Sequence, residues 1–142
     1  MEINFNALIP EFCVADTALS LRFYETLGFT VLYQREEEGF VFLEREGAQL
    51  MLDKVAPDSW ITAPFEKPLG RGVNLQIRVS DVDALYATAG QAGLVMFRPL
   101  YEKWYRVEDT QRGNRQFLIQ DPDGYLLRFY QNLGERQLRR AF

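Results

Sequence analysis

Histidine is absent from this 142-residue chain, and cysteine occurs once, as Cys13. The commonest metal ligand and the commonest acid–base group at neutral pH are therefore both missing. A single cysteine excludes an internal disulfide and is typical of a reducing compartment. We therefore expect a cytoplasmic protein with neither a histidine-based metal site nor histidine-based catalysis.

Long apolar runs and a basic surface are also missing. No segment approaches the roughly 18 consecutive apolar residues that span a bilayer. The first residues, MEINFNALIPEF, lack the basic-then-apolar order of a secretory signal. The net charge of −4 argues against a nucleic-acid partner, which usually needs a basic face, and favours a cationic ligand. We expect neither a membrane nor a nucleic acid as a partner.

The sequence does have enough apolar residues for a core and an unusually high aromatic content. Hydrophobic residues make up 47% of the chain and aromatic residues 14%. The length suits one domain, and the hydrophobic content is sufficient to bury a core. Aromatic side chains pack well in a core, and they also bind flat, unsaturated ligands.

An internal repeat organises the chain. Three residues recur at a constant offset of 65 positions: Val14, Asp16 and Gly28 reappear as Val79, Asp81 and Gly93. In each copy, a helical pattern lies between the aspartate and the glycine. The aspartate is suited to cap the start of this helix, and the glycine is suited to end it.

The segment after each glycine alternates as strands do. We expect strands at 29–35, 40–44 and 49–53 in the first copy, and at 94–99, 116–120 and 125–130 in the second. Gly47 and Leu50 recur as Gly124 and Leu127 at an offset of 77, so the second copy contains 12 additional residues. We place this insertion within about residues 100–114 and expect it to form a longer loop. Each copy is therefore predicted as βαβββ.

The predicted organisation is a single α+β domain over residues 1–142. Module 1 spans about residues 5–54, a linker spans 55–70, module 2 spans about 72–131, and a tail spans 132–142. The two tandem βαβββ modules are expected to form a cup-shaped half-barrel, and the tail is expected to form a short surface helix.

This organisation resembles the glyoxalase/bleomycin resistance protein family of the vicinal oxygen chelate superfamily, over nearly the whole chain. Its most specific segments are Val14-Ala15-Asp16, residues 23–29 (FYETLGF) and residues 121–129 (DPDGYLLRF). Pro10 and the Asp-Pro-Asp-Gly turn resemble the bleomycin-resistance branch most. In that branch a homodimer sequesters a cationic glycopeptide antibiotic in clefts between its subunits, without chemistry.

Enzymes of this superfamily bind a divalent metal through four side chains, and the resemblance carries those positions to Ile9, Met51, Asn74 and Arg128. Isoleucine offers no donor, and methionine is a soft thioether unsuited to hard ions. Asparagine offers one weak carbonyl ligand, and arginine is a permanent cation that repels a metal ion. We expect no metal, no other cofactor and no catalytic residue.

Strand alternation predicts two faces on each sheet. One face is expected to be core: Leu8, Phe12, Val14, Leu50, Leu52, Leu75, Ile77, Val79, Leu127 and Phe129. The other faces the cup: Ile9, Glu11, Met51, Asp53, Asn74, Gln76, Arg128 and Tyr130. This second face is polar for a barrel interior, which favours a cavity for a polar ligand. Glu11, Asn74, Gln76 and Arg128 are the candidate polar contacts, and pairing of Glu11 with Arg128 is the structural alternative.

Aromatic residues in connecting segments are the candidate stacking residues. Tyr33 and Phe40 flank the acidic run 36–38, Trp60 lies in the linker, and Trp104 and Tyr105 lie in the insertion with Tyr101. Stacking on a flat ligand and clamping a homodimer are equally good interpretations of the tryptophans. The resemblance places a tryptophan where this chain has Gly113, and Trp104 is a candidate to fill the same space.

The leading hypothesis is a homodimeric antibiotic-binding protein that sequesters a cationic, aromatic, bleomycin-type drug and so confers antibiotic resistance. One alternative is a metal-free enzyme acting on a small, anionic metabolite held by Arg128. Another is a dimeric interaction module without a small ligand, which the polar cup face disfavours.

Overall fold

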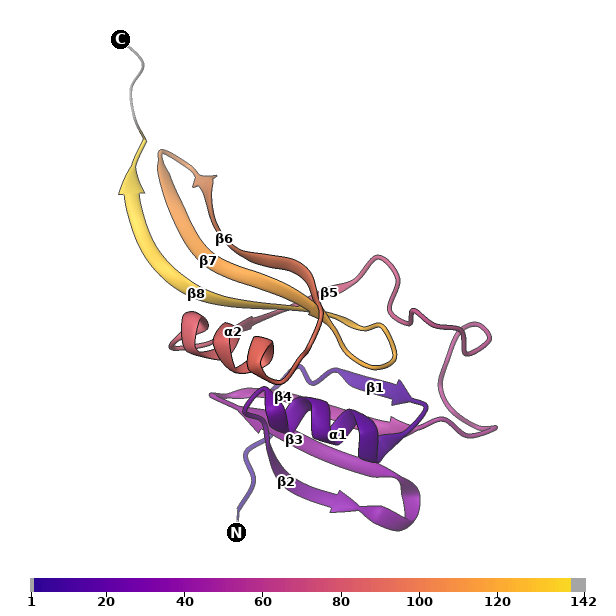
Figure 1. Ribbon diagram of the computed structural model, residues 1–142. Coiled ribbons are helices and arrows are strands. Elements are labelled where there is room, and N and C mark those ends of the chain that lie inside the picture. Colours follow the sequence, from indigo (N-terminus) through magenta and orange to yellow (C-terminus); the bar gives the residue numbers. More distant parts are fainter. Residues whose placement is uncertain (1, 139–142) are drawn as a thin grey trace. The chain divides into compact units, whose positions relative to one another are not determined.

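The computed structural model describes residues 2–138, which fold as two compact units. Unit 1 is the chain up to Val73 together with Asp121–Tyr125, and unit 2 is Asn74–Gln120 together with the chain from Leu126 onward. Within the described residues, each unit has a four-stranded mixed sheet with an α-helix across one face (Figure 1). The predicted α+β class with tandem βαβββ modules is confirmed.

Unit 1 follows the predicted order of elements. Its elements are β1 (Glu11–Val14), α1 (Thr17–Thr26), β2 (Thr30–Arg35), the 3-10 turn η1 (Glu36–Glu38), β3 (Phe40–Arg45) and β4 (Ala48–Lys54). The sheet order is β1-β4-β3-β2, with β1 parallel to β4 and the other pairs antiparallel. The acidic run Glu36–Glu38 forms this 3-10 turn, which is the exposed tip of the hairpin between β2 and β3.

Unit 2 repeats this order with much longer strands. Its elements are β5 (Asn74–Arg78), α2 (Val82–Gln91), β6 (Met96–Val107), β7 (Thr110–Gln120) and β8 (Leu126–Gln137). The sheet order β5-β8-β7-β6 matches that of unit 1, and β5 is again parallel to β8. Within residues 2–138, no helix has the length and apolar character needed to cross a membrane.

The repeated aspartates and glycines have the roles that the sequence predicts. The carboxylates of Asp16 and Asp81 accept hydrogen bonds, of 3.1 and 3.0 Å, from the backbone N–H three residues into α1 and α2. Each satisfies one of the N–H groups that a helix leaves without a partner in its first turn. Gly28 and Gly93, just beyond the helices, have φ of 88° and 76°, which glycine adopts without a steric cost.

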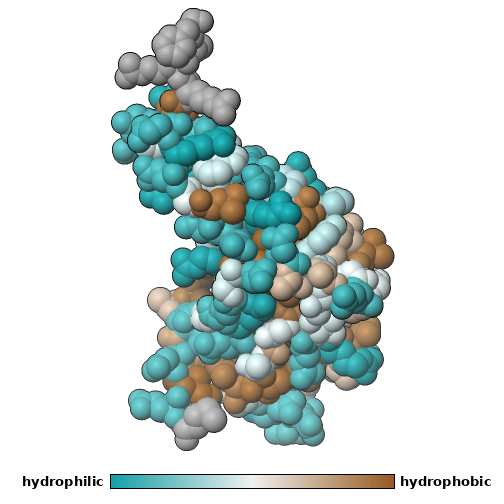
Figure 2. All heavy atoms as spheres, turned by 60° about the vertical axis from the view of Figure 1, so that its left-hand side comes forward, coloured by the Kyte–Doolittle hydropathy of each residue, from teal (hydrophilic) through white to brown (hydrophobic). Residues whose placement is uncertain are grey.

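The insertion forms strand rather than loop, so the prediction of a loop at 100–114 is wrong. β6 continues through Val107 and pairs with β7 in a register that sets Trp104 opposite Gly113. The three strands β6–β8 continue well beyond α2 as a long arm (Figure 1), whose surface is mostly hydrophilic (Figure 2). An added segment that keeps the strand alternation prolongs a hairpin because its backbone groups then pair across the ladder.

The tail prediction is also wrong where the structure describes it. Residues 132–137 continue β8 instead of forming a helix, and residues 139–142 lie outside the described part of the chain. Pairing with β7 decides this outcome, because it satisfies the backbone of both strands along their length. An ion pair of 3.0 Å between Arg112 and Glu135 joins the two strands within the arm.

The helix-facing sides of the two sheets form the cores. The following predicted core residues are buried: Phe12, Val14, Leu50, Leu52, Ile77, Val79, Leu127 and Phe129. Leu75 is only partly buried. Leu8 is 83% exposed, and its assignment to the core is wrong because β1 begins only at Glu11. The repeat therefore predicts most of the core, and it fails outside the strands.

The Asp-Pro-Asp-Gly turn joins the second module in sequence but packs in unit 1. Tyr24 of α1 donates a hydrogen bond of 2.7 Å to Asp121, and the Ala15 backbone donates one of 3.1 Å to Asp123. Both aspartates are buried. Burial raises the pKa of Asp121 to about 6, although the hydrogen bonds from Tyr24 and two backbone N–H groups oppose the shift. This turn therefore ties the second module's chain to the first helix.

Candidate ligand-binding site

The sheet face opposite α1 has an acidic half and an aromatic half. The strand register places two rows across this face, Glu11–Met51–Phe42–Tyr33 and Cys13–Asp53–Phe40–Arg35. Residues directly opposite one another on neighbouring strands share a face. The carboxylates therefore gather on β1 and β4, and the rings gather on β3 and β2.

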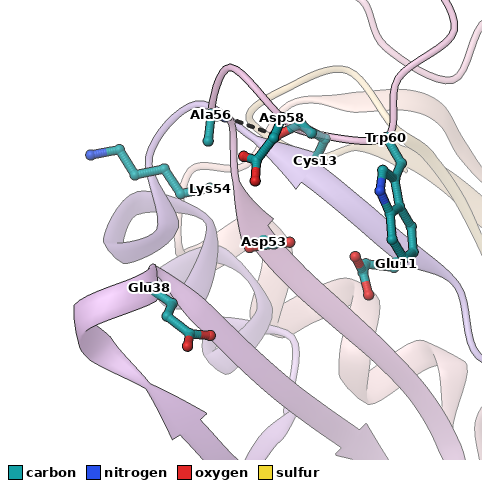
Figure 3. A pocket seen from close by; sticks show the side chains of 9 residues that line it. Glu11, Cys13, Glu38, Asp53, Lys54, Ala56, Asp58 and Trp60 are labelled. Atoms are coloured by element: carbon teal, nitrogen blue, oxygen red, sulfur yellow. Dashed lines mark hydrogen bonds between the residues drawn. The ribbon is translucent and has the colours of Figure 1, made fainter.

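A cavity of about 470 Å³ opens over the acidic half (Figure 3), and we refer to it as the acidic cavity. Its lining residues are Glu11, Cys13, Glu38, Asp53, Lys54, Ala56, Asp58, Ser59 and Trp60. They come from β1, β4, η1 and the start of the linker. Four of them are carboxylates and one is a lysine, whose ammonium group is directed away from the cavity in Figure 3.

The electrostatics of the acidic cavity favour a bound cation. Burial raises the pKa of Glu11, the negative charge of Asp53 raises it further, and the positive charge of Arg35 lowers it. A raised carboxyl pKa means that the ionised form lacks sufficient compensation from its surroundings. Arg35 is itself engaged, because it pairs with Glu38 and its guanidinium lies 4.0 Å from the centre of the Phe40 ring. A cation in the cavity would supply the missing compensation.

Cys13 lines the same cavity as a free thiol. Burial raises its pKa, and the neighbouring carboxylates add to the rise, while a hydrogen bond with Ser59 opposes it. The thiolate is the nucleophilic form, so this environment makes Cys13 a weak nucleophile at neutral pH. The thiol is therefore better suited to contact a ligand than to attack one.

Trp60 is the most exposed large side chain near the cavity. The Ala56 backbone donates a hydrogen bond of 2.8 Å to the Ser59 hydroxyl, which closes a turn in the linker immediately before Trp60. The indole is 98% exposed at the cavity rim (Figure 3). An exposed indole at the rim of a cavity offers a flat surface on which a ligand can stack.

Tyr33 and Phe40, the other predicted stacking residues of unit 1, lie in the aromatic half. Tyr33 packs against Phe5, Phe40 and Phe42, with ring centroids 5.4–6.5 Å apart. Phe40 is only 5% exposed and lies beneath Arg35. Among the described residues that line the acidic cavity, neither ring is included. Of the predicted ligand contacts, the structure thus brings Glu11 and Trp60 together.

The predicted contacts of unit 2 divide in the same way. Gln76, Tyr105 and Arg128 line a second cavity, of about 250 Å³, on the sheet face opposite α2. Arg128 donates a hydrogen bond of 2.6 Å to the side chain of Gln76, its neighbour on β5. Asn74 begins β5 opposite Leu126 and is not one of the described residues lining this cavity.

Trp104 lies within the arm rather than in a flexible loop. Its indole lies over Gly113, where an added Cβ would come within 2.7 Å of the ring. The ring therefore occupies the space that a side chain at position 113 would need, as the sequence suggested. Covering a strand glycine with a cross-strand aromatic ring stabilises a sheet. The Arg136 guanidinium lies 3.9 Å from the ring centre, so a ligand must displace it before stacking there.

Sequence reasoning missed several of the lining residues. Cys13, Asp58 and Ser59 were not proposed as contacts in the first cavity, nor were Lys103, Asn114 and Gln116 in the second. Continuing the strand alternation through the insertion would have placed Lys103 beside Asn114 and Gln116. Asp58 and Ser59 lie in an irregular turn, for which the sequence offers no comparable periodicity.

The four positions that hold a metal in the enzymes do not fit a divalent ion here. Met51 offers a thioether and Ile9 offers nothing, while Asn74 offers one amide oxygen. The Arg128 guanidinium is a fixed positive charge at the remaining position, where it bonds to Gln76. No mechanistic step is therefore assigned to a metal.

Two tandem βαβββ modules, each with a four-stranded mixed sheet, define the vicinal-oxygen-chelate fold. Residues 7–129 match the model of the Glyoxalase/Bleomycin resistance protein/Dioxygenase superfamily, and the chain belongs to this family. It is 26% identical over 135 residues to a bleomycin resistance protein of Geobacillus stearothermophilus, covering 88% of this chain and 96% of the relative.

Two further comparisons agree with this assignment. A bleomycin resistance protein of Klebsiella pneumoniae is 28% identical over 110 residues, covering 78% of this chain and 79% of the relative. The crystal structure of a bleomycin-binding protein complexed with bleomycin aligns with a TM-score of 0.61 at 24% identity, covering 90% of this chain and 99% of that one. At this identity the structural likeness shows the fold.

Proposed function

We propose that this protein is a metal-independent binding protein that sequesters a cationic, aromatic antibiotic of the bleomycin type. The observation that carries this proposal is the acidic cavity of unit 1, with an exposed indole at its rim. The similarity to curated bleomycin resistance proteins supports it independently.

The carboxylates select the charge of the ligand. Each exposed carboxylate contributes only about 0.2–1 kcal/mol to the binding of a cation, because water and salt screen it. Glu11 and Asp53 are set on the sheet rather than at the hairpin tip, and Glu11 is partly desolvated. Charges in such a position attract a cation more strongly than fully solvated ones. We assign the charge selection chiefly to this pair.

The indole of Trp60 selects for a flat group next to that charge. Stacking removes apolar area from water at about 25 cal/mol per Å², and a cation over the ring adds about 0.5–2 kcal/mol. A ligand with a planar ring and a nearby amine would use both features. This combination fits a drug-like cation better than a simple metal ion.

Binding without chemistry is the form of activity that the lining residues support. Cys13 has a raised pKa and is a weak nucleophile. The carboxylates are suited to hold a cation, which in turn favours their ionised state. Protection would then arise from sequestration, with the drug released unchanged.

We further propose that the protein acts as a homodimer in the cytoplasm, as the resemblance to the bleomycin-resistance branch implies. Two-fold homodimers are the commonest oligomers of soluble proteins. Sedimentation is expected to give twice the chain mass of 16.6 kDa. A monomer at micromolar concentration would contradict this part of the proposal.

The proposal is tested by titrating bleomycin into the full-length wild type and into the double variant Glu11→Gln/Asp53→Asn. We expect this double variant to weaken drug binding at least tenfold. The matched control is Glu36→Gln/Glu37→Gln, which removes the same charge from the neighbouring tip outside the cavity lining. The control is expected to change the affinity by less than about threefold, and by less still at high salt.

Cys13 provides a reporter for the site, because it is the single cysteine of the chain and lines the cavity. Bound drug should slow its alkylation, and the drug should be recovered chemically intact. Bacteria expressing the protein should survive bleomycin better than controls. Modified drug would instead indicate an enzyme, and unprotected Cys13 with no drug binding would exclude this ligand class.

A further inference from the structure

The second cavity, in unit 2, has a charge opposite to that of the acidic cavity, and we refer to it as the basic cavity. Its lining residues are Gln76, Lys103, Tyr105, Asn114, Gln116 and Arg128, which include two cations and no carboxylate. Among the ion pairs formed within residues 2–138, neither Lys103 nor Arg128 takes part. The lining of this small cavity therefore has two positively charged side chains and no carboxylate to balance them.

Two buried polar atoms around this cavity have no hydrogen-bond partner. Arg128 donates through Nη2 to Gln76, but its buried Nε has no acceptor. The Gln116 side chain is 1% exposed and donates through Nε2 to the Tyr101 hydroxyl at 2.6 Å, while its buried Oε1 is unpartnered. A buried polar group without a partner costs about 1–3 kcal/mol, so two at one place point to a bound group.

The pair of Gln116 and Tyr101 can present a donor to the cavity. A tyrosine hydroxyl both donates and accepts, and the two ends of a glutamine amide exchange places on a half-turn. After this turn the Tyr101 hydroxyl donates to Oε1, and the N–H group of Gln116 faces the space that Oε1 occupied. The cavity lining then includes three side chains with free donor groups, Arg128, Lys103 and Gln116.

We propose that the basic cavity binds a small oxyanion, a carboxylate or a phosphate, in unit 2. Arg128 and Lys103 would supply the charge, and Gln116 would supply a neutral donor whose burial fixes its position. The volume of about 250 Å³ is below the roughly 300–1,000 Å³ of pockets that enclose drug-sized ligands. It fits a small anion or the anionic end of a larger molecule. This inference rests on unit 2 and is independent of the proposed drug site.

The inference is tested with the full-length protein and two probes, inorganic phosphate and acetate, each titrated at constant ionic strength against chloride. In an NMR titration, one arginine Nε–H resonance should shift as phosphate or acetate is added, and the shift should saturate. Tighter binding of phosphate would indicate a phosphate ligand, and tighter binding of acetate would indicate a carboxylate ligand. Saturable binding of either probe supports the site, and binding no tighter than that of chloride overturns it.

Three variants separate the cavity from general surface charge. Arg128→Gln and Lys103→Gln should each weaken anion binding at least tenfold, and the Lys103 change keeps the test open if the Arg128 variant does not fold. Arg106→Gln is the matched control, since this arginine lies on the same strand β6 and bonds to the backbone of Glu108 outside the lining. Equal losses in Arg106→Gln and Lys103→Gln would overturn the site. Glu11→Gln/Asp53→Asn should leave anion binding unchanged, so this inference and the proposed drug site fail separately.

Discussion

The two units share a scaffold and differ in the face that the scaffold presents. Glu11 and Gln76 occupy equivalent positions on β1 and β5, and Met51 and Arg128 do so on β4 and β8, by the offsets of 65 and 77 residues. On the helix-facing side, the equivalent residues are apolar in both units. The buried face is constrained by packing, whereas the opposite face is free to acquire a different charge.

The faces differ chiefly in the chemistry of their side chains. Unit 1 has carboxylates and an exposed indole around its cavity, and unit 2 has two cations and buried amides around its own. The arm adds to this difference, because it supplies Lys103 and Tyr105 to unit 2 alone. We infer that each module has its own ligand-binding site, and that the sign of the charge at each site selects its ligand.

The largest expected effect concerns the buried turn that only unit 1 contains. The pKa of Asp121 is raised from 3.8 to about 6 in the folded protein. Between these values the folded state binds more protons at Asp121 than the unfolded state does, so the contribution of Asp121 to the free energy of unfolding falls as pH rises from about 4 to 6. The fall amounts to roughly 3 kcal/mol, at 1.36 kcal/mol for each unit of pKa difference, and it levels off above about pH 6.

Asp121→Asn removes this titration while keeping an oxygen acceptor for the turn. Denaturant unfolding of both proteins at about pH 4 and pH 7 measures the difference, and we expect the variant to lose less stability than the wild type over this range. An equal loss in both proteins would show that Asp121 does not titrate as its burial implies.

A smaller effect should separate the two tryptophans. Trp60→Ala should weaken binding of a cationic aromatic drug by about 1–3 kcal/mol, because it removes the exposed stacking surface of unit 1. Trp104→Ala should lower stability more than affinity, because its ring covers Gly113 and lies beneath Arg136. Calorimetric titration and thermal unfolding of both variants measure the two quantities. The reverse assignment would place drug stacking on the arm.

The smallest effect is the pH dependence of drug binding in unit 1. Burial and the charge of Asp53 raise the pKa of Glu11, so this residue becomes protonated at a higher pH than an ordinary glutamate does. A bound cation favours the ionised form, and its affinity should therefore fall as pH is lowered through that pKa. Titrations of the wild type and Glu11→Gln across this range should converge at low pH. Parallel curves would remove Glu11 from the site.

The sequence predicts the parts of this molecule that follow from periodicity. The repeated Asp16 and Asp81, and the alternation from Leu50 to Asp53, predict the helix caps, the order of elements along each module and the two faces of each sheet. The same reasoning yields Glu11, Gln76 and Arg128 as cavity residues. These positions depend on local rules of capping and alternation, which a single sequence contains.

Other features depend on tertiary pairing, and the sequence does not contain them in local form. The insertion at 100–114 becomes part of the arm because a third strand, β8, pairs with β7 as far as Gln137. The turn at Asp121 packs in unit 1 although its neighbours in sequence belong to unit 2. Phe40 has the pattern of a loop-flanking aromatic residue, but long-range contacts bury it beneath Arg35.

If the charge of each face selects its ligand, one calorimetric comparison will separate the two faces. Bleomycin is titrated into the wild type, Glu11→Gln/Asp53→Asn and Arg128→Gln under the same buffer and salt. We expect at least a tenfold loss of affinity in the first variant and less than a threefold change in the second. A loss confined to Arg128→Gln, or equal losses in both variants, would contradict this selection by charge.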